Sequence, residues 1–280
     1  MKKILYSMLI FLLILLNFST VCADDVDNEV DFEDTIEVTA SNVSELPKTN
    51  SRRYIVYDRI SKSMIIGKNE DIKSAMASTT KIMTTIVILE KADLNETVTV
   101  SAKAGGTGGS RLGLKRGDKA SVRDLLYGLM LRSGNDAAVA LAEHVGGSVK
   151  EFAELMNEKA SELGLTNTHF VTPHGLDDAN HYTTALELAK LTDYAMNNET
   201  FSKIVGTKSI TIYINNQPRQ INNTNELLGV LNGVVGVKTG FTNNAGRCLV
   251  TETKRNNMDI ITIVLGADTK KDRTKDSVNL

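Results

Sequence analysis

The chain of 280 residues is long enough for one large domain or two small ones, and its hydrophobic share of 41% is that of an ordinary globular protein. It carries 32 basic and 34 acidic residues, which are mixed along the chain and give a formal net charge of -2. A nucleic-acid-binding protein is expected to carry a basic face, so the charge argues against that class and implies no nucleic-acid partner.

The N-terminus has the order of a secretory signal peptide. Lys2 and Lys3 precede an apolar run over residues 4–18, and the small residues Val21 and Ala23 suit cleavage after Ala23. A membrane-spanning helix needs roughly 20 apolar residues, and this run is shorter. We therefore expect an exported protein whose signal segment is removed, with no retained anchor evident.

Three segments are expected along the chain: a signal peptide (residues 1–23), an acidic flexible leader (residues 24–51) and a folded domain (residues 52–280). The leader is rich in Asp and Glu and poor in large apolar side chains, so it cannot bury enough surface to offset the entropy of ordering. Loss of Cys22 with the signal peptide would leave Cys248 as the remaining cysteine, so no internal disulfide is expected.

Apolar periodicity predicts strands at both ends of the folded domain and helices between them. A β-hairpin is expected from residues 54–57 and 63–66, and a helix is expected to begin near Ser78. Further helices are expected at residues 122–131, 136–144, 149–163 and 185–196, and further strands at residues 209–214, 234–239, 248–253 and 259–265. The pattern predicts an α+β fold in which one antiparallel sheet, flanked by helices, joins the two ends of the domain, with a helical lobe inserted and a cleft between them.

Residues 104–117 are rich in glycine and contain the run Gly-Gly-Thr-Gly-Gly. A phosphate-binding loop requires a lysine directly after its last glycine, and none follows here. We therefore interpret this segment as a surface loop.

Ser78 and Lys81 are the candidate nucleophile and base. On a helix, residues three apart lie on one face with their β-carbons roughly 5–6 Å apart. A serine hydroxyl is a weak nucleophile until a base takes its proton, and lysine serves as that base only when its pKa falls below the reference value of about 10.4. Burial or a neighbouring cation lowers the pKa of a lysine.

Two further motifs strengthen this interpretation. A Ser-x-x-Lys motif alone arises by chance roughly once in a chain of this length. Here it is followed by Ser133-Gly134-Asn135 at the end of a predicted helix and by Lys238-Thr239-Gly240 at the end of a predicted strand. The last triplet is expected by chance in only about one such chain in fifteen.

The three motifs in this order resemble the penicillin-binding protein and serine β-lactamase superfamily. The surrounding segments 76–84 (MASTTKIMT), 172–178 (TPHGLDD) and 238–242 (KTGFT) are similar to those of low-molecular-mass D-alanyl-D-alanine carboxypeptidases, and the resemblance extends from about Arg53 to the end of the chain. It implies a β-lactamase/transpeptidase-like fold with the active site in the cleft between sheet and helical lobe.

The resemblance also implies a reaction. Ser78 would attack the carbonyl between the two terminal D-alanines of a peptidoglycan stem peptide, release D-alanine and form an acyl-enzyme, with Lys81 as general base. β-Lactams would be covalent inhibitors, and no cofactor is implied. By similarity, the remaining roles fall to Ser133 and Asn135 (proton transfer and substrate binding), Lys238 (positive charge), Thr239 (substrate carboxylate), Gly240 (substrate binding) and the backbone N–H of Phe241, which together with that of Ser78 would form the oxyanion hole.

Two groups of residues leave alternatives open. Arg247 and Arg273 are candidates for binding the substrate carboxylate, and the alternative is that both are exposed structural arginines. His169, His174 and His181 lie close together in the sequence, but no metal-ligand spacing accompanies them, so no metal site is expected.

Alternatives to an active carboxypeptidase also remain. Family members generally continue past the last strand with a long helix, of which residues 270–280 could supply only the start, so a truncated or inactive product is one alternative. A penicillin-binding sensor that is acylated without turnover is another. A serine β-lactamase is disfavoured because no Glu-x-x-Leu-Asn element of the class A kind lies between the second and third motifs. The site of action is expected at the cell wall or the outer face of the membrane, and contact with the membrane surface is left open.

Overall fold

A computed structural model describes residues 46–280 of the chain. The predicted signal peptide and most of the predicted leader fall on residues 1–45, outside the described residues. Within residues 46–280, no helix has the length and apolar character needed to cross a membrane.

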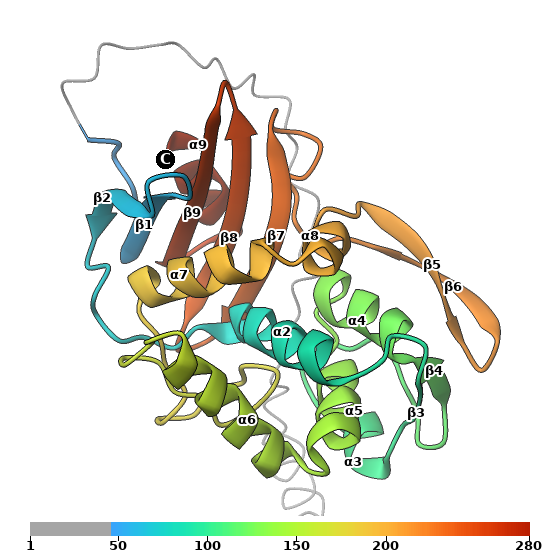
Figure 1. The fold of residues 1–280 in the computed structure, drawn as a ribbon. Helices are drawn as coiled ribbons and strands as arrows, with labels where there is room; N and C mark the ends of the chain where they lie inside the picture. The colour runs from blue at the N-terminus through green and yellow to red at the C-terminus, as the bar shows by residue number, and fades with distance from the viewer. Residues whose placement is uncertain (1–45) are drawn as a thin grey trace, which may run out of the picture.

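One antiparallel sheet joins the two ends of the domain, as the sequence predicted (Figure 1). It has five strands in the order β2-β1-β9-β8-β7, so the N-terminal hairpin pairs with the last strand of the chain. The strands are β1 (Arg53–Asp58), β2 (Ser63–Lys68), β7 (Val234–Thr242), β8 (Gly246–Arg255) and β9 (Met258–Ala267).

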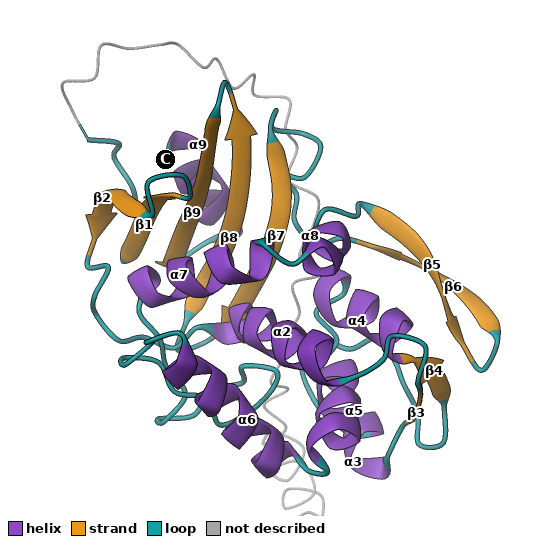
Figure 2. Ribbon diagram, in the orientation of Figure 1, coloured by secondary structure: helices purple, strands orange, loops and turns teal. Residues whose placement is uncertain are grey.

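The helices form a lobe beside the sheet and cover both of its faces (Figure 2). α7 packs against β1 and β9 on one face, and α9 packs against β8 and β9 on the other. The helical elements are η1 (Ala77–Thr80), α2 (Lys81–Lys91), α3 (Ala102–Gly105), α4 (Val122–Leu131), α5 (Asn135–Gly146), α6 (Val149–Glu162), α7 (Ala185–Met196), α8 (Glu199–Val205) and α9 (Lys270–Asn279).

α2 is the centre of the core. Residues 81–88 are all buried, because α2 contacts α4, α5, α6, α7 and α8. A helix that is surrounded on all sides needs small or apolar residues at every position, and apart from Lys81 its sequence over this stretch is Ile, Met, Thr and Val. The one charged side chain buried in this stretch is therefore a conspicuous exception.

The helix expected to begin near Ser78 is present: Ser78 lies in the 3₁₀ turn η1, and α2 follows directly from Lys81. Two other sequence-based expectations were wrong. The strand at residues 209–214 (β5, Ser209–Ile214) does not join the main sheet, because it pairs with β6 (Gln217–Asn222) as a separate hairpin. Residues 104–117 are not merely a surface loop, because Leu112 and Leu114 are buried and pack in the main core. The chain around this loop also forms β3 (Thr97–Thr99) and β4 (Lys119–Ser121), which pair with each other.

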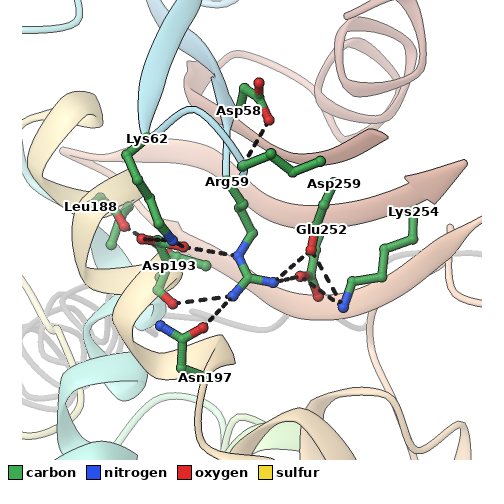
Figure 3. Close-up of polar contacts among 11 residues, drawn as sticks. Asp58, Arg59, Lys62, Leu188, Asp193, Asn197, Glu252, Lys254 and Asp259 are labelled. Carbon is green, nitrogen blue, oxygen red and sulfur yellow. Dashed lines mark hydrogen bonds and ion pairs between the residues drawn. The ribbon is translucent and has the colours of Figure 1, made fainter. Parts of the chain in front are cut away.

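A buried ionic cluster joins the β1–β2 turn to α7, β8 and β9 (Figure 3). Arg59, only 8% exposed, donates from Nε to Asp193 at 3.0 Å, from Nη1 to Asp259 at 2.9 Å and from Nη2 to Asn197 at 2.9 Å. Nη1 also donates to the fully buried carboxylate of Glu252. One guanidinium in the β1–β2 turn thus contacts α7, β8 and β9, which lie at least 134 positions later in the sequence.

The beginning of the described chain is attached to its last helix. The backbone N–H groups of Asn50 and Ser51 donate to one carboxylate oxygen of Asp276 at 2.9 and 2.7 Å, and the Ser51 hydroxyl donates to the same oxygen at 2.5 Å. Ser51 and Asp276 are both buried. The contacts hold the last two residues of the predicted leader against α9.

Candidate active site

Ser78 and Lys81 are in contact at the junction of η1 and α2. Ser78 Oγ and Lys81 Nζ lie 2.8 Å apart, within the hydrogen-bond reach that proton transfer requires. Ser78 is partly exposed, whereas Lys81 is 0% exposed. The predicted pairing is therefore present, although a 3₁₀ turn rather than an α-helix supplies its first residue.

Lys81 has two further partners, and both are oxygen acceptors. Nζ donates to the side-chain carbonyl of Asn135 at 2.8 Å and to the backbone carbonyl of His174 at 2.9 Å. A neutral amine has two N–H donors and one lone pair. If Lys81 is neutral and its two N–H donors go to Asn135 and His174, its lone pair would be left for the hydroxyl of Ser78. The geometry thus suits an amine that accepts the proton of Ser78.

Asn135 is held from its other side by the glycine-rich loop. Its side-chain amide donates to the carbonyl of Gly108 at 2.8 Å, and its backbone N–H donates to the carbonyl of Ser110 at 2.8 Å. A β-carbon added at Gly109, where φ is +78°, would lie 2.6 Å from the Asn135 amide nitrogen. The loop therefore needs glycine at this position to pack against Asn135.

Ser133 lies between α4 and α5, two residues before Asn135. It is 3% exposed and has a φ of +57°, which is uncommon for a residue with a β-carbon. The backbone N–H of Gly134 donates to the carbonyl of Gly128 at 3.2 Å and closes this turn. The predicted Ser-Gly-Asn motif is thus a tight turn that begins α5 beside Lys81.

The Lys-Thr-Gly motif lies on β7 and passes beside η1. A β-carbon added at Gly240 would lie 3.1 Å from the backbone nitrogen of Ser78. Lys238 is buried and donates to the carbonyl of Thr239 at 2.9 Å, and the Thr239 hydroxyl lies 2.9 Å from that of Thr224. The strand therefore brings predicted substrate-binding residues to the nucleophile.

The two candidate arginines occupy different places, and neither is exposed. Arg247, on β8, is 9% exposed and its guanidinium carbon lies 3.9 Å from the ring centroid of Phe241. Arg273 is 1% exposed and lies in α9, where Nη2 is 3.4 Å from Glu226. Arg247 is next to the site through Phe241, whereas Arg273 lies on the sheet face that α9 covers. The alternative that both are exposed was wrong.

The three histidines do not form a metal site within the described residues, where no group of three or more His, Cys, Asp or Glu could hold an ion. Burial first, and then the charge of Lys81, lower the pKa of His174 to about 3. Burial also lowers the pKa of His181 to about 4. Nδ1 of His169 lies 2.6 Å from the carbonyl of Asn180.

Several residues of the site were not singled out from the sequence. Asp177 accepts from the hydroxyl of Thr242 at 2.6 Å and so joins the segment after His174 to β7. Thr224 contacts Thr239, and Gly108 contacts Asn135. Asp177 lies within the segment 172–178 used for the family resemblance, which was a signal for its importance. Gly108 lies in the glycine run that the sequence analysis interpreted as a surface loop. Thr224 carries no local signal, because only the folded chain brings it to the site.

Comparisons with known proteins agree with this geometry. Residues 39–269 match the protein family described as D-alanyl-D-alanine carboxypeptidase. D-alanyl-D-alanine carboxypeptidase DacF of Bacillus subtilis is 38% identical over 225 residues, which are 78% of this chain and 58% of the relative. DacC of Escherichia coli is 38% identical over 265 residues, which are 86% of this chain and 62% of the relative. The chain thus spans about three fifths of the length of these curated relatives.

Among solved structures, the crystal structure of the Streptomyces K15 DD-transpeptidase superposes with a TM-score of 0.80 at 34% sequence identity. The similarity covers 83% of this chain and 96% of that chain. The fold is therefore that of the β-lactamase/transpeptidase type, as the sequence predicted.

Proposed function

Because the chain belongs to the D-alanyl-D-alanine carboxypeptidase family, we propose that it is a serine-type hydrolase that removes the terminal D-alanine from peptidoglycan stem pentapeptides. One observation carries the proposal: Ser78 Oγ lies 2.8 Å from the amine of Lys81, which is buried between the oxygens of Asn135 and His174. This arrangement supports an activated serine.

The first step is acylation. Lys81 takes the proton of Ser78, and Oγ attacks the carbonyl carbon of the penultimate D-alanine. The peptide C–N bond breaks, the leaving nitrogen receives a proton, and D-alanine departs while an ester joins the shortened peptide to Ser78. In the second step water attacks this ester, gives a proton to the site, and frees the peptide and the serine hydroxyl.

The other motif residues receive supporting roles in the proposal. Ser133 passes the proton toward the leaving nitrogen, and Asn135 holds both Lys81 and the substrate. Lys238 and Thr239 bind the substrate carboxylate. The backbone N–H groups of Ser78 and Phe241 stabilise the oxyanion, and each such donor is typically worth about 3–4 kcal/mol. The packing of Gly240 against Ser78 N supports this assignment.

The proposed place of action is outside the cytoplasm. The order of Lys2, Lys3 and the apolar run that follows supports export through a signal peptide. Peptidoglycan peptides lie outside the cytoplasmic membrane, so an exported enzyme would meet its substrate there.

Transfer to an amine is a second candidate reaction, because one similar structure is named a DD-transpeptidase. Both reactions share the acyl-enzyme and differ in the nucleophile that ends it. An amine acceptor such as glycylglycine, added to the assay, separates the two by its product.

The test compares the purified chain with Ser78→Ala, and with Ser161→Ala as a matched control at an exposed serine of α6. We expect fluorescent penicillin to label the chain and Ser161→Ala but not Ser78→Ala, and D-alanine to be released from diacetyl-lysyl-D-alanyl-D-alanine. Labelling without release would favour the penicillin-binding sensor. A cooperatively unfolding chain that is not labelled would refute the serine chemistry.

A further inference from the structure

A buried histidine outside the proposed reaction lies directly behind the nucleophile. His181 is 2% exposed and belongs to the segment between α6 and α7, yet its ring contacts Thr80 in the 3₁₀ turn that carries Ser78. Its two ring nitrogens contact Thr80 and the backbone of Val171 rather than Ser78 or Lys81, so the ring has no place in the steps above.

The hydrogen bonds of the ring fix its tautomer. Nδ1 accepts from the backbone N–H of Val171 at 3.0 Å and lies 3.4 Å from that of Thr172. Nδ1 is therefore unprotonated, and the ring proton is on Nε2. Nε2 lies 2.8 Å from the hydroxyl oxygen of Thr80 and donates to it.

The Thr80 hydroxyl links the His181 ring to the backbone of the 3₁₀ turn. Its oxygen accepts from His181, so its proton is available for the carbonyl of Ala77, 2.8 Å away. Thr80 and Ala77 are 0% and 1% exposed, so water does not reach these groups. A continuous chain of donors thus runs from the Val171 backbone through His181 and Thr80 to the residue that precedes the nucleophile.

Ala77 is the strained residue of this turn. Its φ is +48°, in the left-handed region, where a residue with a β-carbon is strained. Such a conformation persists only where the surroundings hold it. A β-carbon added at Gly175 would lie 1.9 Å from the Ala77 carbonyl oxygen and 2.5 Å from Thr80 Oγ1, so the backbone of Gly175 seals the same carbonyl.

The ring stays neutral at the pH where the enzyme would work, because burial lowers the pKa of His181 to about 4. The neighbouring ionisable groups that act on its pKa are Asp178, His169 and Lys81. A neutral ring keeps one donor and one acceptor, which is what this chain of hydrogen bonds needs.

We propose that His181 is a positioning residue: through the Thr80 hydroxyl it holds the Ala77 carbonyl, and so holds Ser78 Oγ in contact with Lys81 Nζ. The assignment rests on the proposed serine function. In this proposal the N–H on Nε2 holds the Thr80 hydroxyl, and the acceptor Nδ1 fixes the tautomer.

Two substitutions separate the two ring nitrogens. His181→Gln carries an amide N–H at about the reach of Nε2, whereas His181→Asn carries a carbonyl oxygen at about the reach of Nδ1 and no donor that reaches Thr80. Stopped-flow labelling with a fluorescent penicillin at several concentrations gives the acylation rate constant separately from the affinity of the non-covalent complex.

We expect His181→Asn to lower the acylation rate constant roughly 10- to 100-fold, the size that follows from misplacing a reacting atom by about 1 Å. The non-covalent affinity should stay within about twofold, because no substrate contact is removed. His181→Gln should restore most of the rate. Thr80→Val should repeat the loss and Thr80→Ser should not, and His144→Asn, at an exposed histidine of α5, is the matched control.

Normal acylation by a folded His181→Asn or Thr80→Val variant would overturn the proposal, as would equal loss of rate in Thr80→Val and Thr80→Ser. If His181→Asn does not fold, the comparison of Thr80→Val with Thr80→Ser tests the proposal by itself. Absence of labelling in the unsubstituted chain would instead refute the proposed function.

Discussion

Two buried ionisable side chains, those of Lys81 and Glu252, have very different neighbours. Lys81 contacts three oxygens, those of Ser78, Asn135 and His174, and these contacts support its proposed role as the base. Glu252 is the opposite case, a carboxylate that packs against another carboxylate. The structure leaves one oxygen of Glu252 and one of Asp259 without a hydrogen-bond partner among the described residues. One proton shared between these two oxygens would give each of them a hydrogen-bond partner.

Glu252 should therefore make the stability of the protein depend on pH. Burial first, and then the hydrogen bond with Asp259, raise the pKa of Glu252 to about 7, while Arg59 acts in the opposite direction. The folded state keeps a proton that the unfolded state loses above roughly pH 4.3. The free energy of unfolding attributable to this group should thus fall as the pH rises from about 4.3 to about 7, and the loss should be complete above that.

Thermal unfolding of Glu252→Gln tests this. The amide keeps the shape of the protonated acid but does not ionise, so the melting temperature of the variant relative to the parent should be higher at pH 8 than at pH 5. Glu158→Gln, at an exposed position of α6, should show no such trend. Parallel melting curves for Glu252→Gln and the parent across this range would contradict the assignment.

At the scale of elements, the glycine-rich loop shows how α5 organises the site. Asp136 is 0% exposed, and its carboxylate accepts from the backbone N–H groups of Leu112, Gly113 and Leu114 at 2.8, 2.7 and 2.9 Å. The first turn of α5 thereby holds the loop whose Gly108 carbonyl positions Asn135. A carboxylate that accepts several backbone donors at a helix N-terminus is also favoured by the helix dipole.

Asp136→Ala should destabilise the fold and slow acylation together. The substitution leaves three buried backbone N–H groups, those of Leu112, Leu114 and Ala137, without this acceptor, which costs about 1–3 kcal/mol for each group. Urea unfolding gives the stability, and penicillin labelling gives the rate. Asp136→Asn, which keeps one acceptor oxygen, should lose less of both. Unchanged labelling by Asp136→Ala would show that the loop does not position Asn135.

The elements that could be predicted from the sequence are those set by local pattern. The helices at α4, α6 and α7 and the strands of the main sheet follow from apolar periodicity, and the contact of Ser78 with Lys81 follows from a spacing of three residues. The strand β5 was predicted, but its pairing with β6 was not, because strand propensity does not determine which strand pairs with which.

The rest could not be predicted because it depends on contacts between distant segments. The 3₁₀ turn at Ser78 is held by Gly175 and His181, which lie about a hundred positions away, and His181 is 101 positions from Thr80. The sequence suggested His181 only as a weak metal candidate. Its actual surroundings are two backbone N–H groups and a hydroxyl.

At the scale of the whole molecule, the Asp276 contacts join the start of the domain to α9. Asp276→Ala would leave the buried N–H of Ser51 without its acceptor, at a cost of about 1–3 kcal/mol. We expect the melting temperature to fall by roughly 2–10 °C for a domain of this size. Lys275→Ala, one position earlier and exposed, is the control. Penicillin labelling of the folded Asp276→Ala variant should be unchanged, because α9 lies on the face of the sheet away from Ser78.

The pairing of β1 with β9 also determines when the protein can fold. Ser51 meets Asp276 across 225 positions, and the sheet has no centre until β9 lies beside β1. Closing so long a loop must precede the contacts that compensate for it, so sheet formation should be slow compared with the formation of local helices. During synthesis the hairpin of β1 and β2 would stay unpaired on one side until β9 had been made. The sheet therefore cannot form before nearly all of the described chain has been made.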